Sequence, residues 1–183
     1  MERGRVVGFF VAVVAMFVTS CIVIDEFEPK QRTQIENYLQ NGKKDYYVTS
    51  DSAFVVLEGN RLLAAGDPRP KGAEKDDRVS FNVEAYTFNS SPATKPYYTN
   101  KRYLAEQLST TLDTSYWDFE PYSIRLGHGE IINGLDEALE GSIVGDSILV
   151  FLTSSLAYGA AGMGAVPKDT AVMMILTVEQ LEQ

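Results

Sequence analysis

Residues 147–181 read SILVFLTSSLAYGAAGMGAVPKDTAVMMILTVEQL, two apolar runs on either side of a glycine-rich loop. The runs, residues 147–152 and 171–181, are rich in Val, Ile and Leu, a composition typical of strands buried in a sheet. The loop has neither the Lys-Ser/Thr of a P-loop nor a GxGxxG motif opening a helix, so we do not expect it to bind phosphate. The stretch therefore predicts two strands joined by a long loop.

Further strands are predicted on the N-terminal side of this stretch. Residues 45–49 and 53–57 flank a Ser-Asp-Ser turn and are expected to form a hairpin, and residues 122–126 are expected to form a short strand. Residues 78–88 alternate with period two, which is typical of a strand with two different faces. One face carries Val79, Phe81, Val83 and Ala85, and the other carries Ser80, Asn82, Glu84 and Tyr86.

Helices are expected to be few and short. Residues 29–41 carry an apolar stripe at i, i+3 and i+4 from Ile35, which we interpret as core packing, and residues 134–139 have room for one or two turns. Because strands dominate, the predicted fold class is α+β with an antiparallel sheet. Residues 89–111 are polar, contain Ser-Ser-Pro and Lys-Pro breaks, and are expected to form an insertion with a short helix near residues 103–108.

The composition excludes several classes of function. The chain has 183 residues, with 16 Lys and Arg against 25 Asp and Glu, a formal net charge of −9. An acidic chain is a poor nucleic-acid binder, because phosphate contacts require clustered basic residues. One Cys and one His are too few for a disulfide framework or a Cys/His metal site, so we expect neither a metal nor a cofactor.

The first residues have the pattern of an export signal. Arg3 and Arg5 precede residues 6–18, which are 13 uncharged residues, too few for a bilayer-spanning helix of about 20. Residues 18–21, Val-Thr-Ser-Cys, resemble the bacterial lipobox. That resemblance implies cleavage before Cys21 and acylation of this Cys, for example with palmitate, and an ordinary signal with a chance Cys is the alternative.

These patterns divide the chain into three parts. A lipoprotein signal peptide is expected at residues 1–20, a lipid-anchored tether with the N-terminal helix at 21–44, and one domain at 45–183, with the insertion at about 89–111. The acidic residues that follow Cys21 resemble the surface-export signals of some Bacteroidetes lipoproteins. A solvated acidic tether explains the same residues.

From residue 112 onward the chain carries an ordered set of short motifs. They are Leu112-Asp113, Pro121-Tyr122, Leu126-Gly127, Ile131-Ile132-Asn133-Gly134-Leu135, Val144-Gly145, Ala157-Tyr158-Gly159 and Val166-Pro167. Over about 70 residues, their order and spacing resemble those of the FKBP-type peptidyl-prolyl isomerases. Upstream, residues 78–88 resemble the family's strand that carries a pocket tyrosine, and Tyr86 is expected in that place.

The resemblance implies a curved antiparallel sheet wrapped around a short helix, with an apolar pocket between them. Bacteroidetes FKBP lipoproteins are similar to this chain also in having an N-terminal helix before the domain. Leu112 stands where the family has Phe and Leu135 where it has the Trp of the pocket floor, so a pocket of different shape is expected. The implied substrate-binding residues are Tyr86, Leu112, Tyr122, Ile131, Leu135, Met163 and Met174.

The resemblance also implies catalytic roles for three residues. The Tyr158 hydroxyl is expected to donate to a substrate carbonyl, the Ile132 backbone N–H to be a second donor, and the Asp113 carboxylate to lie near the pocket rim. Each has a structural alternative that the sequence leaves open. Tyr158 is then a half-buried loop aromatic, Asp113 a turn former and Ile132 a core residue.

The expected function is that of a peptidyl-prolyl cis-trans isomerase that assists the folding of exported proteins. Its expected partners are proline-containing polypeptides and, through the N-terminal lipid, the membrane. The expected location is the bacterial cell envelope at the outer membrane, with the leaflet left open. Two alternatives remain: an FKBP-like peptide-binding lipoprotein with little or no isomerase activity, and a carbohydrate-binding lipoprotein, suggested by the scattered aromatics of the insertion.

Overall fold

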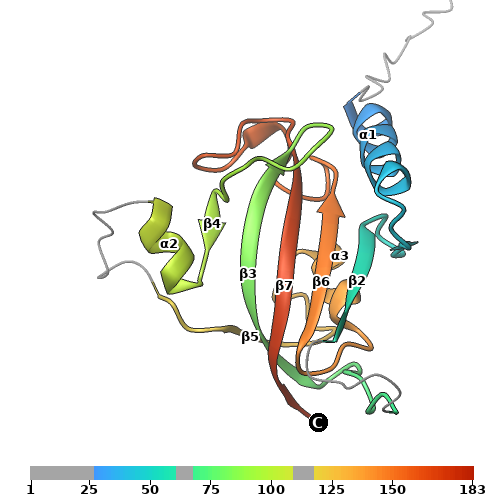
Figure 1. Ribbon diagram of the computed structural model, residues 1–183, viewed down its shortest axis with the longest axis vertical. Helices are drawn as coiled ribbons and strands as arrows, with labels where there is room; N and C mark the ends of the chain where they lie inside the picture. The colour runs from blue at the N-terminus through green and yellow to red at the C-terminus, as the bar shows by residue number, and fades with distance from the viewer. Residues whose placement is uncertain (1–26, 61–67, 109–117) are drawn as a thin grey trace, which may run out of the picture.

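The computed structural model describes residues 27–60, 68–108 and 118–183, which form a seven-stranded antiparallel sheet flanked by helices (Figure 1). The sheet order is β1-β2-β6-β7-β3-β4, and β5 pairs with β3 beside this path. The strands are β1 (Tyr47–Val48), β2 (Phe54–Asn60), β3 (Arg78–Phe88), β4 (Tyr98–Thr99), β5 (Tyr122–Arg125), β6 (Asp146–Leu152) and β7 (Ala171–Glu182). The helices are α1 (Phe27–Asn41), α2 (Arg102–Leu108), α3 (Asn133–Leu139) and the 3-10 turn Gly159–Ala161.

The predicted α+β class with an antiparallel sheet and an N-terminal helix is confirmed. The two apolar runs at residues 147–152 and 171–181 are β6 and β7, which pair directly with one another. The segment at 89–111 is more regular than its composition indicates, because it contains β4 and α2, and β4 pairs with β3. In the described ranges, none of the helices has the length and apolarity needed to cross a membrane.

The sheet has a buried core on each face. On one face, alternate β3 side chains such as Val79 and Val83 pack with Leu135 and Leu139 of α3. The other face packs against α1, whose Ile35 and Leu39 are fully buried. Successive side chains of a strand point to opposite faces, so both cores are built from the same strands.

Helix α1 belongs to the folded domain, because its apolar stripe packs on the sheet. Tyr38 meets Phe88 edge to face, with ring centroids 5.4 Å apart, and Phe88 meets Phe151 at the same separation. Edge-to-face aromatic pairs add to the free energy gained from area burial. The apolar stripe therefore serves as core packing, as the sequence analysis interpreted it.

A buried glutamine joins α1 to the loop between β6 and β7. The Gln31 side chain is 7% exposed; its Nε2 donates to the Asp169 carbonyl at 2.8 Å and its Oε1 accepts from the Ser154 N–H at 2.7 Å. Asp169 in turn donates its N–H to the Gly159 carbonyl at 3.0 Å. One side chain thus ties together the start and the end of the loop that carries Tyr158.

We predict that Gln31→Ala lowers the free energy of unfolding by about 1–3 kcal/mol, because it leaves the Ser154 N–H and the Asp169 carbonyl without their side-chain partner. The measurement is urea unfolding, together with amide exchange at Ser154. Gln34→Ala is the matched control, since Gln34 is on the same helix and bonds only to exposed Asn89 and Ser90. Equal stability of the two variants would contradict the prediction.

Candidate functional site

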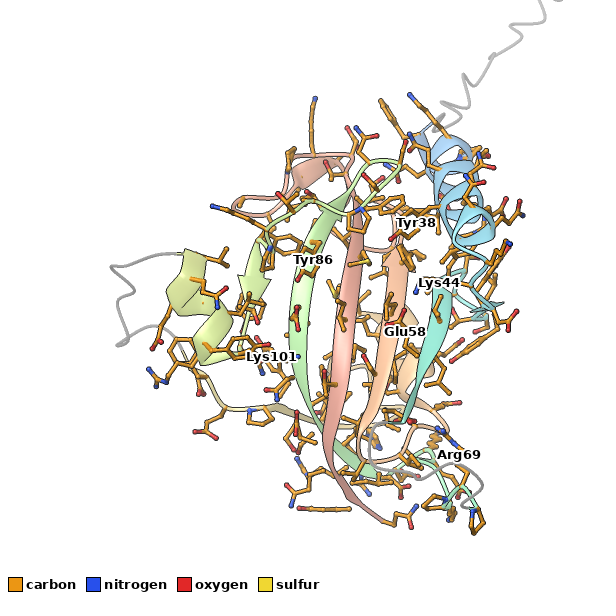
Figure 2. The ribbon with its side chains drawn as sticks, viewed as in Figure 1. Tyr38, Lys44, Glu58, Arg69, Tyr86 and Lys101 are labelled. Carbon is orange, nitrogen blue, oxygen red and sulfur yellow. The ribbon has the colours of Figure 1, made fainter. Side chains whose placement is uncertain are left out.

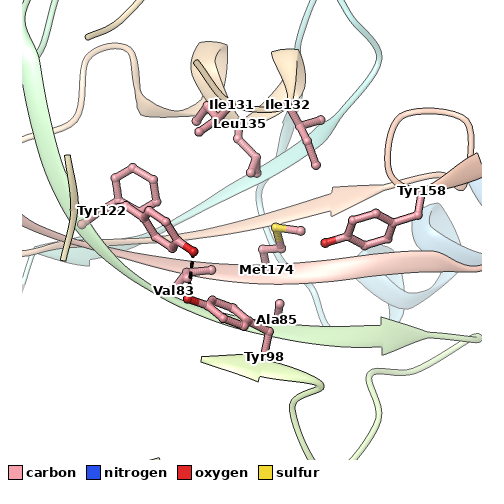
Figure 3. Close-up of a pocket in the computed structure, with 10 residues that line it drawn as sticks. Val83, Ala85, Tyr98, Tyr122, Ile131, Ile132, Leu135, Tyr158 and Met174 are labelled. Atoms are coloured by element: carbon pink, nitrogen blue, oxygen red, sulfur yellow. Dashed lines mark hydrogen bonds between the residues drawn. The ribbon is translucent and has the colours of Figure 1, made fainter. Parts of the chain in front are cut away.

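A cavity of about 250 Å³ lies between α3 and the sheet (Figure 3). Apart from tyrosine hydroxyls, its lining side chains carry only hydrocarbon or thioether groups. They are Phe81, Val83 and Ala85 of β3, Tyr98 of β4, Tyr122 of β5, Ile131, Ile132 and Leu135 around the start of α3, Tyr158 of the β6–β7 loop, and Met174 of β7. Such an apolar lining favours the binding of an apolar group.

The first turn of α3 forms one wall of the cavity. Ile131 and Ile132 are half-buried and immediately precede the helix, and Leu135 is 6% exposed. The Leu135 N–H donates to the Ile132 carbonyl at 2.8 Å, which holds this turn closed. The Ile132 N–H lies at a helix N-terminus, where backbone amides have no partner within the helix.

Gly134 lets α3 approach the sheet closely. A Cβ atom built on Gly134 would lie 2.7 Å from the Ala53 Cβ and 3.0 Å from the Leu152 Cδ2. Any larger residue must push the helix or the strands apart, because carbon atoms do not pack at such distances. Gly134 therefore sets the depth at which Ile131 and Leu135 face the cavity.

The three tyrosines that line the cavity belong to two hydrogen-bonded tyrosine pairs. Tyr98 and Tyr122 are joined at 2.8 Å, and Tyr97 and Tyr158 at 3.1 Å. Figure 3 shows Tyr158 and the Tyr98–Tyr122 pair on either side of Met174. Burial, and then the hydrogen bond to the paired tyrosine, raises the pKa of Tyr97 and of Tyr98. Both hydroxyls therefore stay protonated at neutral pH.

A buried asparagine fixes the segment that supplies Tyr98. Asn100 is 1% exposed; its Oδ1 accepts from the Val83 N–H at 2.8 Å and its Nδ2 donates to the Glu120 carbonyl at 3.0 Å. Thr99 adds a bond from its hydroxyl to the Val83 carbonyl at 2.9 Å. These contacts hold β4 and the approach to β5 on β3, with Tyr98 and Tyr122 beside each other.

On the opposite face of β3, a polar cluster holds the same segment. Glu84 accepts from the Lys101 ammonium at 2.8 Å and from the Tyr86 hydroxyl at 2.7 Å. Figure 2 labels Tyr86 and Lys101 of this cluster. Lys101 also donates to the Thr177 hydroxyl at 3.2 Å. Burial, followed by the bond to Glu84, raises the pKa of Tyr86. The segment after β3 is thus attached both to the β3 backbone and to side chains on one face of β3.

The structure brings six of the expected site residues to one cavity and separates two from it. Tyr86 was expected in the pocket, but Ala85 occupies the cavity face, and period two places the next residue on the α1 face. Met163 is not among the residues that line the cavity; it is 58% exposed on the β6–β7 loop. Leu112, Asp113 and Cys21 lie outside the described residues. The six that line the cavity are Tyr122, Ile131, Ile132, Leu135, Tyr158 and Met174.

Four lining residues were not among the candidates from the sequence. Phe81, Val83 and Ala85 had a usable signal, since the alternation of β3 places all three on one face, the face opposite to Tyr86. The sequence holds no signal that would have identified Tyr98, because its segment is polar and shows no hydrophobic periodicity. Only the pairing of β4 with β3 brings it to the cavity.

The family model for FKBP-type peptidyl-prolyl cis-trans isomerases matches residues 69–179, more than half of the chain. The chain therefore belongs to the FKBP-type peptidyl-prolyl cis-trans isomerase family, as the motif order predicted.

Two curated relatives match parts of the chain. Peptidyl-prolyl cis-trans isomerase FKBP15-3 of Arabidopsis thaliana is 30% identical over 119 residues, which cover 65% of this chain and 68% of that protein. FK506-binding protein 2 of Debaryomyces hansenii is 33% identical over 66 residues, 36% of this chain. The chain spans about half of that protein, 49% of its length.

Solved structures show the same fold. FkpA from Escherichia coli has a TM-score of 0.51 at 19% identity, with 85% of this chain and 62% of that chain covered. A peptidyl-prolyl cis-trans isomerase from Pseudomonas syringae has a TM-score of 0.51 at 16% identity, with 85% and 96% covered. The FKBP-like fold expected from the sequence is confirmed.

We predict that Gly134→Ala destabilises the protein by about 1–3 kcal/mol, the usual cost of overpacking a core. Alanine is a better helix former than glycine by about 1 kcal/mol, so helix propensity alone would make Gly134→Ala more stable. A net loss in the free energy of unfolding would therefore be caused by the overlap with Ala53. In urea unfolding, the double variant Gly134→Ala/Ala53→Gly should lose less than the sum of the two single variants, because it removes the overlapping methyl. Additive losses would refute a close contact at this point.

Proposed function

We propose that this chain is an active peptidyl-prolyl cis-trans isomerase that assists the folding of exported proteins in the bacterial cell envelope. The observation that carries the activity is the apolar cavity with the Tyr158 hydroxyl at its edge. Membership of the family supports the reaction class. The envelope location is supported by the signal-like residues 1–20 and by Cys21 in its lipobox context.

An apolar cavity suits this reaction because of the electronic structure of the peptide bond. Resonance gives the C–N bond a rotation barrier of about 18–20 kcal/mol. The planar form is charge-separated and stabilised by water, so transfer to a water-poor cavity weakens the resonance and favours the twisted amide. Bonds that precede proline are the natural target, since their cis and trans forms differ by only about 0.5–1 kcal/mol.

The size of the cavity fits one residue of a polypeptide. Its volume of about 250 Å³ is below the roughly 300–1,000 Å³ of sites that enclose drug-sized ligands. In the proposed complex, Ile131, Leu135 and Met174 contact the proline ring. The Tyr158 hydroxyl donates to a substrate carbonyl, with the Ile132 N–H as a second donor. Each 1.36 kcal/mol removed from the barrier gives about tenfold in rate, so a 10³–10⁵-fold effect needs about 4–7 kcal/mol.

The location suits the reaction. Uncatalysed isomerisation of X-Pro bonds takes about 10–100 s at 25 °C and limits the folding of many chains. A lipid on Cys21 would keep the enzyme where exported chains fold, at the outer membrane. Several acyl chains, or a chain with a second signal, are needed for stable anchoring.

A second candidate function is peptide binding with little turnover. Two cavity residues favour it: Leu135 stands where the family has Trp, and Met174 is flexible, so the cavity is less rigid than an aromatic one. A loose cavity can bind a prolyl residue without holding the twisted amide better than the planar one. Only interactions stronger in the transition state accelerate a reaction.

In a protease-free isomerisation assay on a prolyl tetrapeptide, we predict turnover above background for the purified full-length chain. Tyr158→Phe should lower kcat/KM about 3–10-fold, since it removes one hydrogen bond to the substrate. Tyr86→Phe is the matched control: it also loses one hydrogen-bonded hydroxyl, but on the opposite face of β3, and should leave kcat/KM unchanged.

If the folded wild-type chain isomerises the tetrapeptide no faster than the uncatalysed background rate, the proposal that it is an enzyme is wrong. Peptide affinity that persists in that case would establish the binding function. Equal turnover of Tyr158→Phe and the wild-type chain would remove the role given to this hydroxyl.

We predict that Cys21→Ser abolishes lipid attachment, because this is the one Cys of the chain. The measurement is metabolic labelling with radioactive palmitate in a bacterial host, followed by membrane fractionation. The wild-type chain should carry label and sediment with the membrane, and the variant should do neither. Label that persists in Cys21→Ser, or a wild-type chain without label, would contradict the lipoprotein assignment.

A further inference from the structure

Tyr158 reaches the cavity already bonded to a second tyrosine. The Tyr97 hydroxyl lies 3.1 Å from the Tyr158 hydroxyl, and the two rings meet edge to face at 6.1 Å and 80°. Tyr97 comes from the segment that follows β3, 61 residues before Tyr158 in the sequence. Tyr97 packs on the same core as Tyr158 but does not line the cavity itself.

The backbone of Tyr97 is held on the sheet. Its N–H donates to the Ala85 carbonyl at 2.8 Å, and the next residue, Tyr98, is the β4 residue that pairs with Ala85. Further along, Asn100 bonds to the β3 backbone at Val83, and Lys101 bonds to the Glu84 side chain of β3. The Tyr97 ring is partly buried and packs against the same core cluster. The backbone of Tyr97 is therefore held by the sheet through contacts that do not involve Tyr158.

The direction of the hydrogen bond follows from the chemistry of the substrate. A tyrosine hydroxyl has one proton to donate and lone pairs to accept with, whereas a carbonyl oxygen only accepts. When Tyr158 gives its proton to a substrate carbonyl, the bond to Tyr97 persists only if Tyr97 donates to the Tyr158 oxygen. Hydrogen bonds in such a chain polarise and strengthen one another.

We propose that Tyr97 is a positioning residue for this site: it donates its hydroxyl proton to Tyr158 and so directs the Tyr158 proton at the substrate carbonyl. The proposal rests on the isomerase function proposed above. Under this proposal the segment between β3 and α2 contributes a functional residue to the site, although the sequence analysis interpreted this segment as an insertion. The ring of Tyr97 supplies packing, and the hydroxyl supplies the orientation.

The experiment is a double-mutant cycle on the full-length chain, with kcat and KM measured on the same prolyl tetrapeptide. Tyr97→Phe keeps the ring and its edge contact and should lower kcat/KM about 3–10-fold, the effect of one hydrogen bond. In the Tyr158→Phe background the same change should cause no further loss, because the oxygen that Tyr97 orients is then absent. Tyr103→Phe, on an exposed tyrosine of α2, is the control and should not change turnover.

A purely structural role gives a different pattern. It would lower the urea midpoint and kcat/KM of Tyr97→Phe to the same extent in both backgrounds, and such additivity overturns the proposal. Tyr97→Phe with wild-type kcat/KM also overturns it, while the isomerase function stands.

Peptide affinity, measured by fluorescence titration with the same tetrapeptide, separates the two proposals. If the wild-type chain binds without turnover, the isomerase function fails, and a non-additive 3–10-fold loss of affinity in the same cycle still supports the positioning role. A wild-type chain that neither turns over nor binds the peptide overturns both.

Discussion

The antiparallel pairing of β3 with β7 is the constraint on which the other features depend. It runs through eleven residue pairs from Arg78 to Phe88, with a register shift between Ser80 and Phe81, and its register assigns each side chain of both strands to one of the two faces of the sheet. A slip of one residue would turn every side chain to the opposite face. This register brings Ala85 and Met174 together at the cavity and sends Tyr86 to the other face. The pocket is thus a consequence of strand register before any residue of the loops is placed.

The two faces of the sheet carry different features, the cavity on the α3 face and an aromatic core on the α1 face, and Gln31 links them. The α3 face holds the cavity, and close approach at Gly134 sets the position of its isoleucine wall. The α1 face holds the aromatic core under the N-terminal helix. Gln31 connects the two, because its amide bonds to both ends of the loop from which Tyr158 enters the cavity. A helix that precedes the family match at residues 69–179 therefore stabilises the loop of the site.

The cavity combines an apolar interior with hydroxyls at its edge. An apolar wall lowers the cost of twisting an amide only if it excludes water, and a donor at the edge is useful only if it points at the right atom. In each tyrosine pair the two hydroxyls are hydrogen-bonded to one another, and under the proposal above the bond from Tyr97 directs the Tyr158 proton. Leu135 stands where the family has the larger Trp, and Tyr98 from the segment after β3 lines the cavity together with Ala85.

The sequence by itself determined the strands other than β4, the apolar and the polar face of β3, one or two helical turns at residues 134–139 and the family. Local periodicity and motif spacing along the chain specify these features. Only the tertiary structure shows that Tyr98 lines the cavity, that Tyr97 bonds to Tyr158 and that Gln31 bonds to both ends of the loop that carries Tyr158. The contacts concerned join residues that are 61 positions apart for Tyr97 and Tyr158 and 123 apart for Gln31 and Ser154. No local pattern encodes such distances; they follow from strand register and from the packing of helices on both faces of the sheet.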